Sequence, residues 1–96
     1  MIDYRVLEYD KVIAQGRSGI DISWIWSLDR DLIPMLGHLL PYADTMFNSS
    51  QVSSLATELD RLPAGSPLVP DVRDDLKHLC ELTANGGHRQ LWFFGD

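Results

Sequence analysis

The chain ends in Gly86-Gly87-His88-Arg89-Gln90-Leu91-Trp92-Phe93-Phe94-Gly95-Asp96, and the rest of the fold has to accommodate this stretch. The glycine pair ends an amphipathic segment, and a short aromatic run of strand type follows it. Chain ends are usually polar and frayed, so three consecutive large rings must be buried against the chain's own core or against a partner. We therefore expect a short strand over residues 91–94.

Two helices are expected before this strand. Apolar residues recur at helical spacing over residues 50–62 and again over residues 71–84. Ser50 and Asp71 would cap the amino termini of these helices, and Asn85-Gly86-Gly87 would end the second one. The connector between them cannot continue a helix because it contains three prolines, Pro63, Pro67 and Pro70.

The first segment, residues 3–15, fits two patterns. Apolar residues alternate as in a strand over residues 2–6 but follow helical spacing over residues 6–13. We favour a helix that Asp3 caps and Gly16 ends, with the strand as the alternative.

The middle of the chain contributes one extended segment and one helix. Isoleucine and tryptophan alternate with other residues over 20–26, which predicts an extended segment. Leucines at helical spacing predict a helix over 31–40, capped by Asp31. The expected fold class is mainly α (small α+β), one domain over 1–96. Three to four helices pack with two short extended segments, 20–26 and 91–94, whose aromatic faces would meet if the two segments lie side by side.

Composition excludes several classes of protein. The 96 residues contain 14 Asp and Glu against 8 Lys and Arg, a net charge of −6, and the basic residues do not cluster. Such a surface disfavours nucleic acid and anionic membranes. A single cysteine rules out an intrachain disulfide and a cysteine-based zinc cage. With neither a signal peptide nor a long apolar run, we expect a soluble cytoplasmic protein.

The titratable residues form no recognisable catalytic or metal motif. His78 and Cys80 are two apart on the expected last helix, so their side chains point in nearly opposite directions and do not share a metal ion. Cys80 paired with His88 or His38 would make a nucleophile and base, but nothing in the sequence marks this thiol as activated. We therefore expect a protein that is not an enzyme and that needs no metal or cofactor.

Carboxylates near the helix starts admit two interpretations. Asp29 and Asp31 fit helix capping better than paired catalysis. Asp74, Asp75 and Glu81 would form an acidic outer face on the last helix, suited to a basic partner.

The tryptophans also admit two interpretations. Trp24, Trp26 and Trp92 belong either to the core or to a recognition surface, because tryptophan is enriched at binding hot spots.

In size, acidity and a terminal strand after a helix, the chain resembles small acidic bacterial immunity proteins. This resemblance implies an inhibitor that blocks a toxin through a negatively charged face, and it assigns no functional residue. The leading hypothesis is a non-enzymatic protein-binding module that neutralises a basic partner. An alternative is a small ligand-binding or enzymatic subunit with a pocket between Trp24, Trp26 and the tail, residues 88–94. In that case His88 or Asp21 would point into the pocket. A third hypothesis is a homodimer that buries the aromatic tail.

Overall fold

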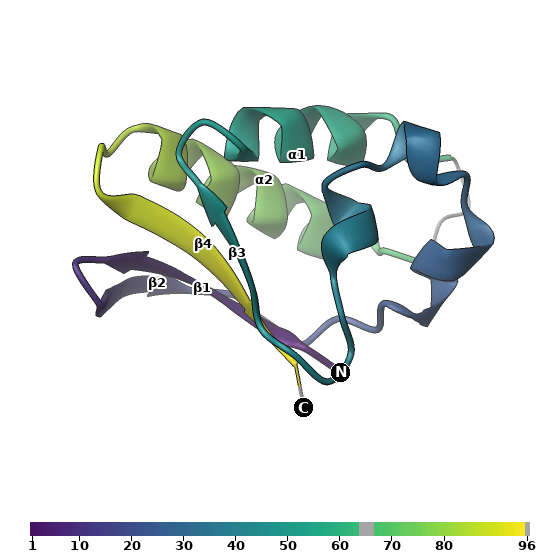
Figure 1. The fold of residues 1–96 in the computed structure, drawn as a ribbon, viewed down its shortest axis with the longest axis horizontal. Coiled ribbons are helices and arrows are strands. Elements are labelled where there is room, and N and C mark those ends of the chain that lie inside the picture. Colours follow the sequence, from purple (N-terminus) through teal and green to yellow (C-terminus); the bar gives the residue numbers. More distant parts are fainter. Residues whose placement is uncertain (64–66, 96) are drawn as a thin grey trace.

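Four antiparallel strands and two α-helices form two layers in the computed structural model, which describes residues 1–63 and 67–95 (Figure 1). The strands are β1 (Asp3–Glu8), β2 (Lys11–Gln15), β3 (Thr45–Asn48) and β4 (Arg89–Phe94). The α-helices are α1 (Val52–Asp60) and α2 (Pro70–Ala84). Three short 3-10 helices precede β3: η1 (Ser23–Ser27), η2 (Arg30–Leu32) and η3 (Leu36–His38).

The fold is therefore α+β, and the expected mainly α class with three to four helices is wrong. Residues 3–15 form the β1–β2 hairpin rather than a helix. Tyr9 and Asp10 make its two-residue turn with φ of 49° and 67°. Paired left-handed residues match the twist of a hairpin, and aspartate tolerates that conformation. The alternation over residues 2–6 therefore indicated the correct structure, and the helical spacing over residues 6–13 did not.

The middle of the chain also differs from expectation. The segment expected to be extended carries η1, and only Ile20 bridges to Ile2 as a strand would. The expected helix over 31–40 is replaced by η2 and η3. Pro34 and Gly37 both oppose a continuous helix there. Asp29, not Asp31, caps η2, since its carboxylate accepts the backbone N–H of Asp31 at 3.0 Å.

The expected C-terminal strand is present, and it is central rather than peripheral. The sheet order is β2-β1-β4-β3, so β4 pairs with β1 on one side and β3 on the other. It does not pair with residues 20–26, the other segment that the sequence predicts to be extended. Phe93 lies opposite Tyr4 of β1, and Leu91 lies opposite Val6. Alternate rings of the aromatic run are thereby buried inside the chain.

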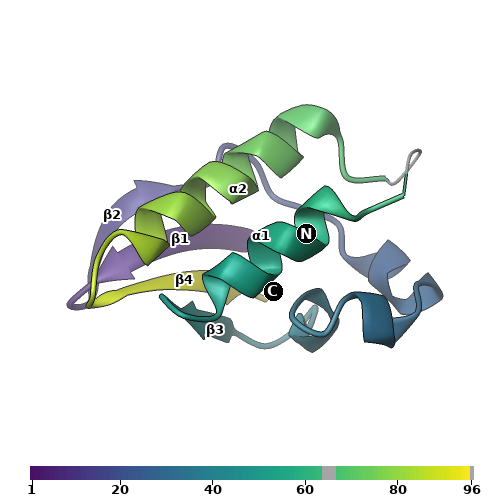
Figure 2. The same ribbon diagram turned by 90° about the horizontal axis from the view of Figure 1, so that it is seen from above.

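Both α-helices lie on the same face of the sheet (Figures 1 and 2). The core fills the space between these layers. Its largest fully buried side chains include Tyr4, Val6, Val52, Leu55, Leu59, Leu76, Leu91 and Phe93. In the part of the chain that the structure describes, no α-helix covers the opposite face of the sheet.

A buried carboxylate ties the irregular segment to the helical layer. Glu58 of α1 is 5% exposed, and its two oxygens accept the backbone N–H groups of Met35 and Leu36 at 2.9 to 3.1 Å. These amides stand at the start of η3, where no intrahelical acceptor exists for them. The glutamate therefore acts as a cap supplied from a distant element.

Candidate functional site

Three carboxylates form an exposed row along α2. Asp71, Asp74 and Glu81 are solvent-exposed and lie at spacings of three and seven residues, on the side of the helix opposite Leu76 and Leu79. Within the described residues these three carboxylates make no hydrogen bond or ion pair of their own. We call Asp71, Asp74 and Glu81 the acidic α2 row.

Asp75, expected on the same acidic face, is turned toward the sheet. It accepts the Tyr4 hydroxyl proton at 2.6 Å and the Arg17 backbone N–H at 3.0 Å, and its side chain is 9% exposed. Burial and this hydrogen bond raise the pKa of Tyr4 above its usual range. Asp75 thus joins α2 to β1 and does not belong to the exposed row. A Cβ at Gly16 would collide with the Tyr4 ring, which explains the glycine directly after β2.

Three basic side chains form ion pairs within the molecule. Arg17 pairs with Asp75, Lys77 with Asp60 of α1, and Arg89 with Glu8 of β1. The hydrogen bond to Asp60 is the main reason that the pKa of Lys77 is raised, and Asp74 and Glu81 add to it. These pairs neutralise carboxylates other than those of the acidic α2 row.

Asp29 and Asp31 are not brought to the acidic α2 row. They belong to η2 and its cap, and α1 lies between that region and α2 (Figure 2). Both are exposed, and the Asp29 carboxylate is engaged in capping. The structure therefore separates the five predicted acidic residues into three places.

The three tryptophans are not gathered either. Trp24 and Trp26 lie on η1, whereas Trp92 lies on β4. Trp24 packs against the core and donates its indole N–H to the Asp21 carbonyl oxygen. Trp26 is 51% exposed. Trp92 lies on the face of the sheet that the helices leave uncovered.

The cavities beside Trp24 and Trp26 do not reach the C-terminal tail. A cavity of about 240 Å³ adjoins Trp26, and one of about 420 Å³ adjoins Trp24, and both include Asp21. Neither is lined by residues 88–94. His88 lines a different cavity, so the structure does not bring it to Asp21.

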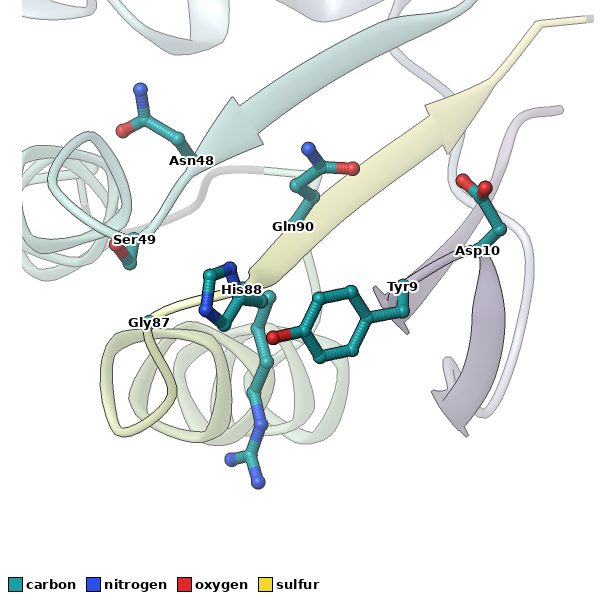
Figure 3. A pocket seen from close by; sticks show the side chains of 8 residues that line it. Tyr9, Asp10, Asn48, Ser49, Gly87, His88 and Gln90 are labelled. Carbon is teal, nitrogen blue, oxygen red and sulfur yellow. The ribbon is translucent and has the colours of Figure 1, made fainter.

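That cavity, the end pocket, lies where three turns meet (Figure 3). It has a volume of about 360 Å³ and is lined by Tyr9, Asp10, Asn48, Ser49, Gly87, His88, Arg89 and Gln90. The rings of Tyr9 and His88 stack with centroids 4.6 Å apart. Asn48 is held in place because its side-chain oxygen accepts the backbone N–H groups of Ser50 and Gln51, just before α1.

The end pocket contains the residue types of a hydrolytic triad without its geometry. Ser49, His88 and Asp10 all line it, yet no hydrogen bond joins any two of them. His88 stacks on Tyr9, and the Asp10 carboxylate points away from it (Figure 3). A nucleophile and its base must lie within hydrogen-bonding reach, so this arrangement contains no assembled catalytic pair.

Neither the cysteine nor a metal site offers another reactive centre in the described residues. Cys80 is 1% exposed, and burial raises the pKa of its thiol to about 12, which leaves it protonated and inaccessible at neutral pH. In residues 1–63 and 67–95, no three His, Cys, Asp or Glu side chains are grouped as they would be to hold a metal ion. In the same residues, no helix is long and apolar enough to cross a bilayer.

The uncovered sheet face carries large side chains in register. Arg5, Trp92 and Met46 lie opposite one another across β1, β4 and β3. The Arg5 guanidinium lies 5.0 Å from the Phe94 ring centroid, and Trp92 stacks on Phe94 at 5.8 Å. We define the uncovered sheet face by the outward residues of the strands: Asp3, Arg5, Leu7, Val12, Gln15, Met46, Asn48, Gln90, Trp92 and Phe94.

Sequence reasoning missed this face because it depends on β1. Asp3, Arg5 and Leu7 lie on the same side of the backbone only if the first segment is a strand, whereas the sequence pattern favoured a helix. The alternation over residues 2–6 was the signal that would have revealed it.

Comparisons with known proteins give no further assignment. No family model matches the chain, and no curated protein or solved structure shows significant similarity to it.

Proposed function

We propose that this protein is a small, non-enzymatic binding domain that recognises a basic partner protein through the acidic α2 row. The observation that carries the proposal is the alignment of Asp71, Asp74 and Glu81 along the exposed side of one helix. Carboxylates held on a rigid helix steer a basic partner toward that face and pair with its lysines and arginines.

The charge distribution supports this choice of surface. Asp60, Asp75 and Glu8 are engaged in ion pairs. Within the described residues the carboxylates of the row make no ion pair, although Lys77 lies near Asp74 and Glu81, and Arg17 and His78 line a cavity with Asp71 and Asp74. The net charge of −6 adds a long-range attraction for a basic protein and repels nucleic acid and anionic lipid. Catalysis in the end pocket is less well supported than binding through the acidic α2 row, because no hydrogen bond links Ser49, His88 and Asp10.

The class of protein that best fits this description is an acidic inhibitor of the immunity type, which blocks a basic target by covering it. We place its action in the cytoplasm, where a lone thiol such as that of Cys80 stays reduced.

The test compares two triple variants in a pull-down from the source lysate. The row variant is Asp71→Asn, Asp74→Asn and Glu81→Gln, and the control variant is Asp29→Asn, Asp31→Asn and Asp44→Asn. Each removes three negative charges, so the two have the same net charge. We expect the wild type and the control to retain the same basic protein at low salt and to release it at high salt.

The row variant should retain at least ten-fold less of that protein. Equal losses of the retained protein in both variants would mean that only net charge determines binding. The acidic α2 row would then not be the binding surface. Capture that resists high salt, or no capture by the wild type, would contradict an electrostatically steered partner.

A further inference from the structure

We infer that the uncovered sheet face is the contact between two copies of this chain, which pack face to face as a weak homodimer. This inference does not depend on the acidic α2 row, which lies on the helical layer on the other side of the sheet (Figures 1 and 2). The dimer would leave two such rows facing outward.

The composition of the face is that of an interface centre. Arg5 and Trp92 lie on the two central strands, with Phe94 at the end of β4 and Met46 beside Trp92 on the edge strand β3. Trp, Phe, Met and Arg are residue types enriched at protein interfaces. Amide side chains, which suit the wetter rim, stand nearer its margins at Gln15, Asn48 and Gln90. Met46 is 40% exposed, and Val12 adds further exposed apolar surface on β2.

The charge of the face points to a second copy rather than to a basic partner. Its ionisable side chains are Asp3 and Arg5, so the face is formally neutral although the chain carries −6. The two residues lie two apart on β1 and share one side. In a two-fold arrangement, Arg5 of each copy can therefore meet Asp3 of the other, which makes the face self-complementary.

Arg5 also carries a donor that the described part of the chain does not satisfy. Its Nε atom is buried and has no hydrogen-bond acceptor there, while its guanidinium is oriented by the Phe94 ring. A buried donor without an acceptor is costly, and because the chain itself encloses Nε, a carboxylate from a second copy would reach it only if the Arg5 side chain turned outward on association.

The edges of the sheet are poorer contact sites than its face. β2 is irregular, with a bulge opposite Val6 and Leu7, and it begins with Lys11, both of which discourage another strand from pairing there. β3 has only four residues. Association by strand addition is therefore disfavoured at both edges.

The expected dimer is weak because the face is small. Four strands about 4.8 Å apart, with about five residues of roughly 3.3 Å each, cover a patch of roughly 15 by 17 Å. Stable dimers bury about 800 Å² on each partner, so this contact belongs with the small, reversible ones. We expect dissociation on the order of 100 μM.

Sedimentation equilibrium of the wild type from about 10 μM to about 1 mM tests the inference. The weight-average mass should rise from one chain toward two chains, and the rise should be larger at high salt. Salt screens the repulsion between two chains of charge −6, whereas it weakens capture of a basic partner. A one-chain mass at every concentration and both salts would overturn the inference, whatever the pull-down shows.

Matched variants locate the contact. Met46→Glu adds a charge on the face, and Leu40→Glu adds the same charge at a residue outside the sheet that is 50% exposed. We expect Met46→Glu, and equally Met46→Lys, to weaken association at least ten-fold, and Leu40→Glu to leave it within two-fold.

Equal weakening by Met46→Glu and Leu40→Glu would place the contact elsewhere and overturn the inference. Circular dichroism at about 10 μM, a concentration at which one chain dominates, shows whether each variant is folded. Should Met46→Glu not fold, Val12→Glu on the same face takes its place.

Discussion

The two faces of the sheet are built from the same strands and have opposite fates. Tyr4 and Phe93 lie under the helices and are each 1% exposed. Their sequence neighbours Arg5 and Phe94 point the other way and contact each other on the uncovered sheet face. A strand sends successive residues to alternate sides, so a single step in sequence separates core from surface.

The difference teaches that large rings do not identify the core of this protein. The run Trp92-Phe93-Phe94 has one ring in the core and two on the uncovered sheet face. Whether a ring belongs to the core depends on which face of the sheet it occupies, because the helices cover only one face. Tyr4, Phe47 and Phe93 lie beneath the helices, where the Phe93 ring contacts the other two. Under the proposed homodimer, the uncovered sheet face would serve association rather than folding.

The largest expected effect separates these two roles. Phe93→Ala should lower the free energy of unfolding by about 3–5 kcal/mol, because it leaves a cavity in a closed core. Trp92→Ala should lower it by no more than about 1–2 kcal/mol, because that ring is only partly buried and its loss leaves no closed cavity. Urea denaturation followed by circular dichroism measures both. Similar losses for the two would mean that the faces are buried alike, and the comparison would fail.

A smaller effect is expected from the tie between the covered face and α2. Tyr4→Phe removes the hydroxyl that donates to Asp75 and should lower the free energy of unfolding by about 2 kcal/mol at neutral pH. The ring and its packing stay in place. A loss above about 4 kcal/mol would instead indicate disrupted packing.

The same variant carries a pH signature. The pKa of Tyr4 is raised in the folded state, so its proton stabilises the fold fully below the unfolded pKa of about 10. That contribution is lost as pH rises above about 10 toward the higher folded value. Wild type should therefore lose more stability than Tyr4→Phe between about pH 9.5 and 11. Cys80 titrates in both proteins and cancels in this difference. Parallel losses would exclude the Tyr4 proton as the cause.

Part of this fold was predictable from local sequence. The periods of residues 50–62 and 71–84 gave α1 and α2, because a helix with one apolar side needs no distant information. The last strand followed from aromatic residues after a glycine pair. The hairpin was missed because Tyr9-Asp10 is not a typical hairpin turn sequence, although both residues adopt the left-handed conformation that closes the β1–β2 pair.

The candidate surfaces divide in the same way. Asp74 and Glu81 were predictable as exposed, since helical spacing alone places them. Asp75 was not, because its carboxylate is drawn inward by Tyr4, which is 71 residues away in the chain. The uncovered sheet face required knowing which strands are neighbours, and single-sequence patterns do not supply that order.

The smallest expected effect concerns Arg5, where two terms oppose each other. Its stacking over Phe94 stabilises the fold by about 0.5–1 kcal/mol, while its buried Nε without an acceptor costs about 1–3 kcal/mol. Arg5→Met keeps the apolar stem and removes both terms, so the free energy of unfolding of the monomer should stay within about 1 kcal/mol of wild type or rise. Urea denaturation at about 10 μM measures this, and sedimentation at about 1 mM should show the dimer weakened. A loss of more than about 2 kcal/mol would make Arg5 structural and would erase the distinction between a face that folds the chain and a face that joins two chains.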